Sequence, residues 1–167
     1  MTQIKKKMVL FLLLLSNCLI HCVGQDAVEL SIDQIVTETE KINKEIKKFE
    51  MVQTDVNDRS EEGGILKKYY DGKILKKAAL TLFGETGQST SEYYFLNGTL
   101  IFVNEQLEMY KAPLGMGKVE TESMETNKFF LEKQKLIRWI NNEGEIADPN
   151  LYAQKQKEIL DDLEIIF

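Results

Sequence analysis

The residues best suited to nucleophilic or metal chemistry lie at the start of this chain. Cys18, His21 and Cys22 fall within the first 24 residues, and no other cysteine or histidine occurs in the 167. A thiolate is a nucleophile and a metal ligand, and an imidazole exchanges protons near neutral pH. If this segment is removed, the mature chain has no thiol catalysis, no disulfide, and no metal site built from cysteine or histidine.

The pattern around these residues is typical of a cleaved leader. Lys5–Lys7 form a positive start, and Met8–Ile20 is almost continuously apolar. The apolar run is shorter than the roughly 20 residues that span a bilayer. We expect residues 1–24 to be a signal peptide and the mature protein, without a transmembrane span, to be exported to the periplasm or secreted. Two alternatives stay open. Cys18 and the three residues before it resemble a bacterial lipobox, which would give a lipid-anchored envelope protein, and the leader could also stay as an anchor.

Residues 25–167 are acidic. Removal of the leader takes away three of the 21 basic residues and none of the 27 acidic residues. The remaining 18 basic and 27 acidic residues give a net charge of −9. Such a surface repels phosphate backbones, so nucleic-acid binding is disfavoured. The length fits a single domain. Gly115–Lys118 lacks the spacing of a phosphate-binding loop, and we expect no cofactor and no metal.

Carboxylates are the chemistry that remains. Two of them on either side of a glycosidic bond can hydrolyse it, one as acid and one as base or nucleophile. The acidic residues of the central region could form such a pair in the fold: Glu92, Glu105, Glu120, Glu122 and Glu125. Because acids are common throughout the chain, their spacing selects no pair. A glycosidase-like hydrolase is therefore the alternative, and we predict that the protein is not an enzyme and has no catalytic residues.

Helix signals stand at both ends of residues 25–167. Ser31 and Gln34 form a capping box, and apolar residues follow at three- and four-residue spacing, which predicts a helix over 31–49. Asp148 and Pro149 are an N-cap and a first helical residue, which predicts a second helix over 149–164.

The segment between the helices has the character of antiparallel strands. Asp71-Gly72 and Asn97-Gly98 are typical two-residue hairpin turns. Six runs rich in β-branched and aromatic residues predict strands: Ile65–Tyr70, Lys73–Phe83, Thr90–Leu96, Thr99–Glu108, Lys128–Leu131 and Lys135–Ile140. We therefore predict an α+β fold with an N-terminal helix, an antiparallel meander sheet of about six strands, and a C-terminal helix packed on the sheet.

One hairpin pattern recurs along the sheet. Tyr93–Ile101 aligns with Phe129–Ile137, and a shorter copy lies at Tyr69–Leu75; in each, aromatic residues enter a turn and aliphatic residues leave it. The pattern resembles the MORN-variant repeat, which reads aromatic-aromatic-x-Asn-Gly-Lys-Leu and is found in exported bacterial proteins. The resemblance covers about residues 66–140, implies a scaffold of stacked hairpins, and brings no catalytic residue.

Two surfaces of these hairpins could bind a ligand. Pairing the second hairpin about Asn97-Gly98 places Tyr94, Ile101 and Val103 on one apolar face, which is either covered by other elements or left open for a ligand.

Lysines crowd the first hairpin. Pairing about Asp71-Gly72 puts Lys67 opposite Lys76, with Lys73 in between. Such lysines protect a sheet edge from aggregation, or they form an anion site for a lipid headgroup or an acidic glycan.

Taken together, these patterns favour an exported bacterial protein that binds an envelope protein, lipid or glycan through its β-sheet or loops. A hydrolase with paired carboxylates and a structural envelope lipoprotein are the alternatives.

Overall fold

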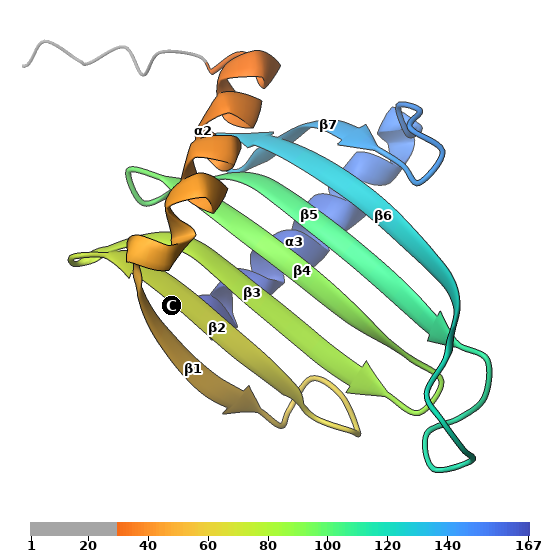
Figure 1. The fold of residues 1–167 in the computed structure, drawn as a ribbon. Coiled ribbons are helices and arrows are strands. Elements are labelled where there is room, and N and C mark those ends of the chain that lie inside the picture. The colour runs from red at the N-terminus through yellow and green to blue at the C-terminus, as the bar shows by residue number, and fades with distance from the viewer. Residues whose placement is uncertain (1–29) are drawn as a thin grey trace, which may run out of the picture.

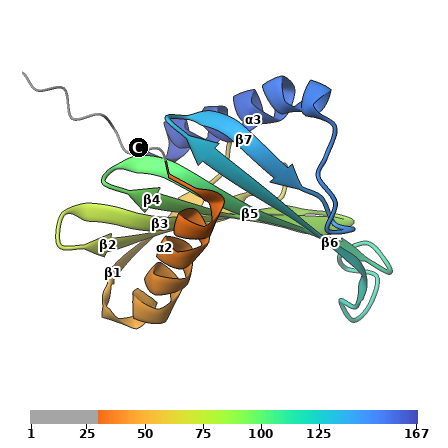
Figure 2. The same ribbon diagram turned by 90° about the horizontal axis from the view of Figure 1, so that it is seen from above.

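The computed structural model describes residues 30–167, so the predicted leader and Cys18 lie outside the described residues. The described residues form one antiparallel sheet whose seven strands are ordered as in the sequence, with a helix on each face (Figures 1 and 2). In chain order, the elements are α2 (Ile32–Glu45), β1 (Glu50–Val56), β2 (Gly64–Asp71), β3 (Ile74–Gly84), β4 (Gly87–Leu96), β5 (Thr99–Tyr110), β6 (Thr121–Glu132), β7 (Lys135–Ile140) and α3 (Tyr152–Ile166). The predicted α+β fold is confirmed, with seven strands in place of six.

The predicted capping residues lie at the start of α2 and of the short helical turn that precedes α3. The Ser31 hydroxyl accepts from the Gln34 amide at 3.2 Å, and the Ser31 amide donates to the Gln34 side chain at 2.8 Å, which is the predicted capping box. The Asp148 carboxylate accepts from the Asn150 amide at 2.9 Å, at the start of a short 3₁₀ helix (Pro149–Leu151) that leads into α3. A single 3₁₀ turn (Ile46–Lys48) connects α2 to β1.

The three hairpins β2–β3, β4–β5 and β6–β7 share one geometry. Each has a two-residue turn and then a β-bulge, in which one residue of the outgoing strand has no partner: Lys76, Ile101 and Ile137. The residue before each bulge is a leucine, buried on the α3 side of the sheet: Leu75, Leu100 and Leu136. The sequence repeat therefore corresponds to a repeated structural unit.

The bulges correct two predicted registers. In the first hairpin the turn residues are Gly72 and Lys73, and Lys67 lies opposite Ala79, so the predicted pairing of Lys67 with Lys76 is wrong. In the second hairpin the turn is Asn97-Gly98 as predicted, but the bulge shifts the pairing beyond Ile101 by one residue. A shift of one residue moves a side chain to the other face.

Each face of the sheet has its own hydrophobic core. Under α2, Ile35 and Ile42 pack on side chains of β4, β5 and β6, namely Tyr94, Ile101, Phe102 and Phe130. Under α3, Ile159 and Ile166 belong to a larger cluster that reaches from Val56 at the end of β1 to Leu136 on β7. The predicted packing of the C-terminal helix on the sheet is confirmed, and the N-terminal helix packs on the opposite face.

The strand that the sequence did not predict is β1. It pairs with β2 over all seven of its residues and forms one edge of the sheet. The lysine-rich hairpin β2–β3 is consequently internal, and its predicted place at the edge is wrong.

Candidate functional site

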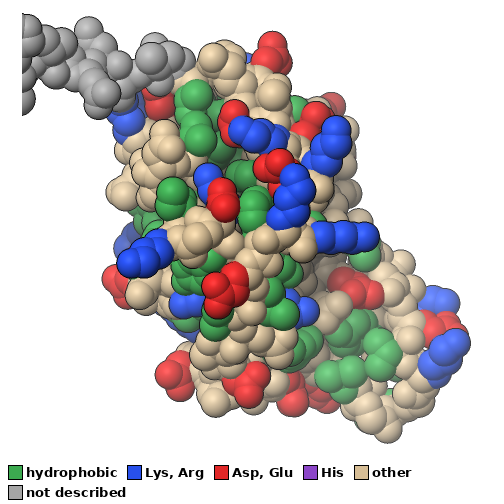
Figure 3. All heavy atoms as spheres, turned by 60° about the vertical axis from the view of Figure 1, so that its left-hand side comes forward, with side chains coloured by type: hydrophobic (Ala, Val, Ile, Leu, Met, Phe, Trp, Pro, Cys, Tyr) green, Lys and Arg blue, Asp and Glu red, His purple; other side chains and the backbone are tan. Residues whose placement is uncertain are grey.

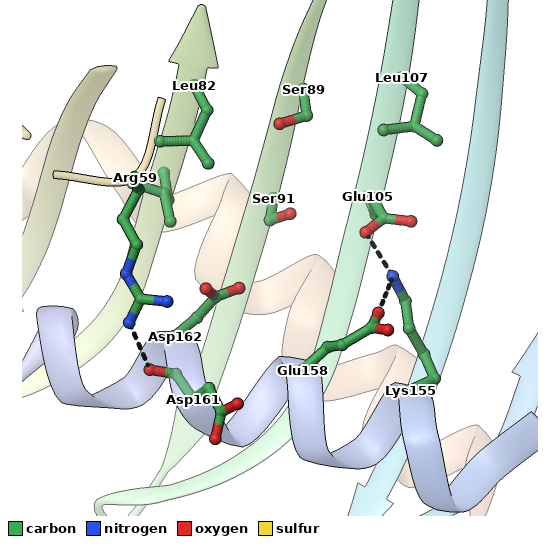
Figure 4. Close-up of a pocket in the computed structure, with 11 residues that line it drawn as sticks. Arg59, Leu82, Ser89, Ser91, Glu105, Leu107, Lys155, Glu158, Asp161 and Asp162 are labelled. Carbon is green, nitrogen blue, oxygen red and sulfur yellow. Dashed lines mark hydrogen bonds and ion pairs between the residues drawn. The ribbon is translucent and has the colours of Figure 1, made fainter. Parts of the chain in front are cut away.

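A cavity of about 320 Å³ lies between α3 and the sheet (Figure 4). The β1–β2 loop, three neighbouring strands and α3 contribute its lining residues: Arg59, Leu80, Leu82, Ser89, Ser91, Glu105, Leu107, Lys155, Glu158, Asp161 and Asp162. Its volume is within the range of small-molecule sites, on the order of 300–1,000 Å³.

The alternation of the strands explains why space remains here. Side chains at every second position of β4 point toward α3. The aromatic Phe95 and Tyr93 fill this side near the hairpin turn, and the small Ser91 and Ser89 follow them. Glu105 stands beside the serines on β5, because Ser91 and Glu105 are paired in the register of the two strands. The change from aromatic to small side chains turns a packed core into a cavity.

An ion-pair network closes one side of the cavity. The Lys155 ammonium lies 2.9 Å from the Glu105 carboxylate and 3.3 Å from that of Glu158, and 5.2 Å from the centroid of the Phe129 ring. Burial alone would lower the pKa of Lys155, but the two carboxylates outweigh it and the pKa is raised. Lys155 therefore stays charged and holds Glu105 and Glu158 in place.

Asp162 is the carboxylate with the most unusual environment. The hydroxyl of Tyr93, which lies in the core next to the cavity, donates to it. Burial raises the pKa of Asp162, although the Tyr93 hydrogen bond and the charges of Arg59 and Lys155 act to lower it. Burial and the neighbouring Asp162 also raise the pKa of Tyr93, so the phenol stays protonated. Tyr93 is thus a buried proton donor, and Asp162 is a half-buried acceptor at the wall of the cavity.

Arg59 bounds the opposite side of the cavity. Its guanidinium donates to the Asp161 carbonyl oxygen at 3.1 Å, which connects the β1–β2 loop to α3. The Asp161 side chain points away from the sheet (Figure 4) and pairs with Lys157 at 3.0 Å. Asp161 therefore contributes less to the field in the cavity than Asp162 does.

A second hollow of about 350 Å³ continues from this cavity along the sheet. The two share four lining residues: Arg59, Leu82, Ser89 and Leu107. Phe83 and Met109 line the far end, where Met109 is 46 % exposed. The two hollows form one groove with a charged end under α3 and an apolar end beyond it.

The charged end has an excess of negative charge. Its lining includes the carboxylates of Glu105, Glu158 and Asp162 against the cations of Arg59 and Lys155, a formal balance of −1, while the charge of Asp161 is offset by Lys157. Within residues 30–167, no three His, Cys, Asp or Glu side chains are grouped as metal ligands would be. The same part of the chain holds no helix long and apolar enough to cross a membrane.

The predicted apolar binding face is not open. Tyr94 and Ile101 are 2 % exposed and lie in the core under α2, while Val103 is 1 % exposed and lies in the core under α3. The bulge at Ile101 separates Val103 from the other two. The first of the two possibilities for this hairpin, that other elements cover it, is confirmed.

The three predicted lysines are spread along the first hairpin. Lys73 is exposed in the turn, Lys76 is at the bulge, and Lys67 is farther along β2. An anion site at these lysines stays a prediction. Their neighbour Lys77 is instead buried under α2.

The residues of the cavity were mostly not found from the sequence. Glu105 is one of the five carboxylates that the sequence offers for a catalytic pair, but the sequence does not indicate that its neighbours lie on α3. The spacing of Lys155, Glu158 and Asp162 puts them on one side of a helix, next to the buried Ile159 and Ile166. Charged residues on the face that packs against a sheet are the signal that could have found them.

No protein family, curated protein or solved structure matches this chain. The MORN-variant resemblance therefore stays a prediction, and the groove has to be interpreted from its own chemistry.

Proposed function

We propose that this protein is an exported, non-enzymatic binding protein whose groove between α3 and the sheet holds a small cationic ligand with an apolar part. The single observation that carries the proposal is the groove itself, with its carboxylate-rich end under α3 and its apolar end at Leu82, Leu107 and Met109. A cation gains from the negative balance of the first end, and an apolar group gains from burial at the second.

The site also fits such a ligand in detail. Lys155 is already neutralised by Glu105 and Glu158, whereas Asp162 has a neutral donor, Tyr93. Because the Tyr93 hydroxyl is neutral, an ammonium group next to Asp162 would add a positively charged partner to this carboxylate. Ser89 and Ser91 offer hydroxyl groups for further polar contacts.

Calorimetric titration with hexylammonium tests this proposal, with hexanoate as the matched anion of equal length. We expect hexylammonium to bind and hexanoate not to bind. Ser91→Leu, which fills the cavity without changing its charge, should abolish binding, and Asp162→Asn should weaken it. Glu164→Gln, which removes one negative charge from the exposed side of the same helix, is the control and should bind as the unaltered protein does. Equal binding of hexanoate, or no effect of Ser91→Leu, would contradict the proposal.

A hydrolase is the second candidate, and one observation favours it. Asp162 and Glu105 line one cavity in different environments, the first with a raised pKa and the second paired with Lys155. Carboxyl groups that differ in this way are the pattern of an acid and a nucleophile or base. Turnover of nitrophenyl glycosides that is lost in both Asp162→Asn and Glu105→Gln would support this candidate, and the absence of turnover would support the binding protein.

A further inference from the structure

The two edges of the sheet are protected very differently. A strand at an edge presents unpaired amides and carbonyls, which natural proteins cover, interrupt or surround with charge. At the β7 edge, the Leu136 amide donates to the Gln156 side chain at 2.8 Å, and the Trp139 amide donates to the Tyr152 hydroxyl at 3.1 Å. The Trp139 carbonyl accepts from Ala147 at 3.0 Å. Side chains of α3 and the segment before it therefore close this edge.

The β1 edge has no such cover, and its charged residues are the two carboxylates Glu50 and Asp55. Within residues 30–167, the backbone of Glu50–Asp55 makes no hydrogen bond outside its ladder with β2. All six of these residues are exposed, including Met51 at 49 % and Val52 at 42 %. The strand has no lysine, no proline and no bulge, and its seven pairs with β2 are in continuous register. It is a regular strand with one free side, at the left of Figure 1 and turned toward the viewer in Figure 3.

The sequence of β1 is compatible with pairing to itself. A two-fold axis perpendicular to the sheet keeps each face of the sheet continuous across the junction between the two copies. Residues opposite each other must then point to the same face, so their positions in the strand differ by an even number. An axis through Gln53 overlaps all seven residues and puts Glu50 opposite Val56, Met51 opposite Asp55, and Val52 opposite Thr54. No like charges face each other in this register, which is the condition for stable cross-strand pairs.

We propose that β1 pairs with β1 of a second copy of this chain, antiparallel about Gln53, to form one continuous fourteen-stranded sheet from two seven-stranded sheets. The pairing gives the open edge its hydrogen bonds and covers Met51 and Val52. One seven-residue ladder buries less surface than the roughly 1,600 Å² of a standard interface, so the dimer is weak and depends on concentration.

A cysteine at the axis tests the register. In a background where Cys18 and Cys22 are serine, Gln53→Cys places two thiols directly opposite each other. The Cα atoms of opposite residues in an antiparallel pair lie about 4.5–5.5 Å apart, within the range of a disulfide. We expect rapid oxidation to a covalent dimer on non-reducing gels. Lys135→Cys, at an exposed position of β7, is the matched control and should stay monomeric.

Charge across the axis tests the same pairing in solution. The double variant Val52→Glu/Thr54→Glu puts two like-charged pairs across the junction, and either single variant puts none. Sedimentation velocity from about 10 to about 500 µM should show a weak dimer of the unaltered protein, at least about tenfold weaker association for the double variant, and little change for the single variants.

Circular dichroism should show that all these variants fold, since the substituted residues are exposed. A monomer at every concentration, together with no cross-link through position 53, would overturn the proposal and leave the edge to a strand of another protein. A dimer that the double variant does not weaken would place the contact on another surface.

Discussion

Both faces of the sheet are covered by a helix, but the core under α2 is sealed, and the hollow on that side lies beside the helix and meets the sheet only at Leu96. Under α2, the polar groups satisfy one another: Lys77 lies 2.7 Å from Glu92 and 3.0 Å from the Asn43 side chain, next to the Tyr94 hydroxyl. Under α3, the core ends at Tyr93 and the groove begins. The α2 face is therefore packed where the α3 face has the space in which we propose that a ligand binds.

The parts of the strands beyond the helices differ in the same way. On the α2 side this region has hydroxyl groups that bond to each other, such as Thr81 and Thr90 at 3.1 Å. On the α3 side it has Leu82, Leu107 and Met109. Polar side chains need no cover, whereas apolar side chains in a groove are stabilised by a ligand. The α3 side is therefore the side on which binding is expected.

The largest expected difference between the faces is in stability. Ile35→Ala removes a side chain that is 0 % exposed at the centre of the sealed core, and should lower the free energy of unfolding by about 2–5 kcal/mol. Leu107→Ala removes a half-buried side chain beside open space, and should lower it by about 1 kcal/mol or less. Urea denaturation followed by circular dichroism measures both. Equal losses would show that the groove is packed as tightly as the sealed face.

The buried ion pair under α2 gives a smaller effect with a defined asymmetry. The Lys77 side chain is 9 % exposed and that of Glu92 is 31 % exposed. Glu92→Gln leaves a buried ammonium without counter-charge and should cost about 1–3 kcal/mol in the same assay. Lys77→Met leaves a carboxylate that water reaches and to which the Tyr94 hydroxyl donates at 2.9 Å, so it should cost less.

An exposed pair is the control for this asymmetry. Lys111 and Glu120 lie 3.0 Å apart with more than half of each side chain exposed. Glu120→Gln should therefore change the free energy of unfolding by about 0.5 kcal/mol or less. A larger loss from Lys77→Met than from Glu92→Gln would mean that the aliphatic part of the lysine, rather than its charge, stabilises this face.

The sequence predicts the local structure of the sealed parts well. The capping box of Ser31 and the turn at Asn97-Gly98 depend only on neighbouring residues, and both occur as predicted. The sequence does not predict β1, because six of its seven side chains are exposed and no alternation of polar and apolar residues marks the strand.

The groove could not be predicted in the same way. The groove depends on the bulge at Ile101, which determines the face of the sheet to which the later side chains of β5 point. It also depends on α3, since Lys155 and Glu105 are 50 positions apart in the chain. A turn determines pairing only up to the first bulge. Contacts between distant segments follow from the topology of the fold, and the residues next to Glu105 in the sequence do not indicate that it meets α3.

The smallest expected effect concerns the protonation of Asp162. Because burial raises its pKa in the folded protein above that of the unfolded chain, the folded state binds a proton more readily. The contribution of Asp162 to stability is therefore fully present below the unfolded pKa of about 4 and is lost as the pH rises through the higher folded value. Asp162→Asn cannot lose a proton, so its stability relative to the unaltered protein should increase between about pH 3 and pH 7.

Two further variants test the cause. Tyr93→Phe removes the hydrogen bond that lowers the pKa of Asp162, so the pKa rises further in this variant. The variant should therefore lose more stability with rising pH than the unaltered protein does. Glu164→Gln, on the exposed side of α3, should follow the unaltered protein. A constant difference between Asp162→Asn and the unaltered protein at every pH would show that burial does not affect this carboxyl. If the carboxyl behaves as expected, a bound cation favours its charged form, and hexylammonium should bind more tightly as the pH rises through the same range.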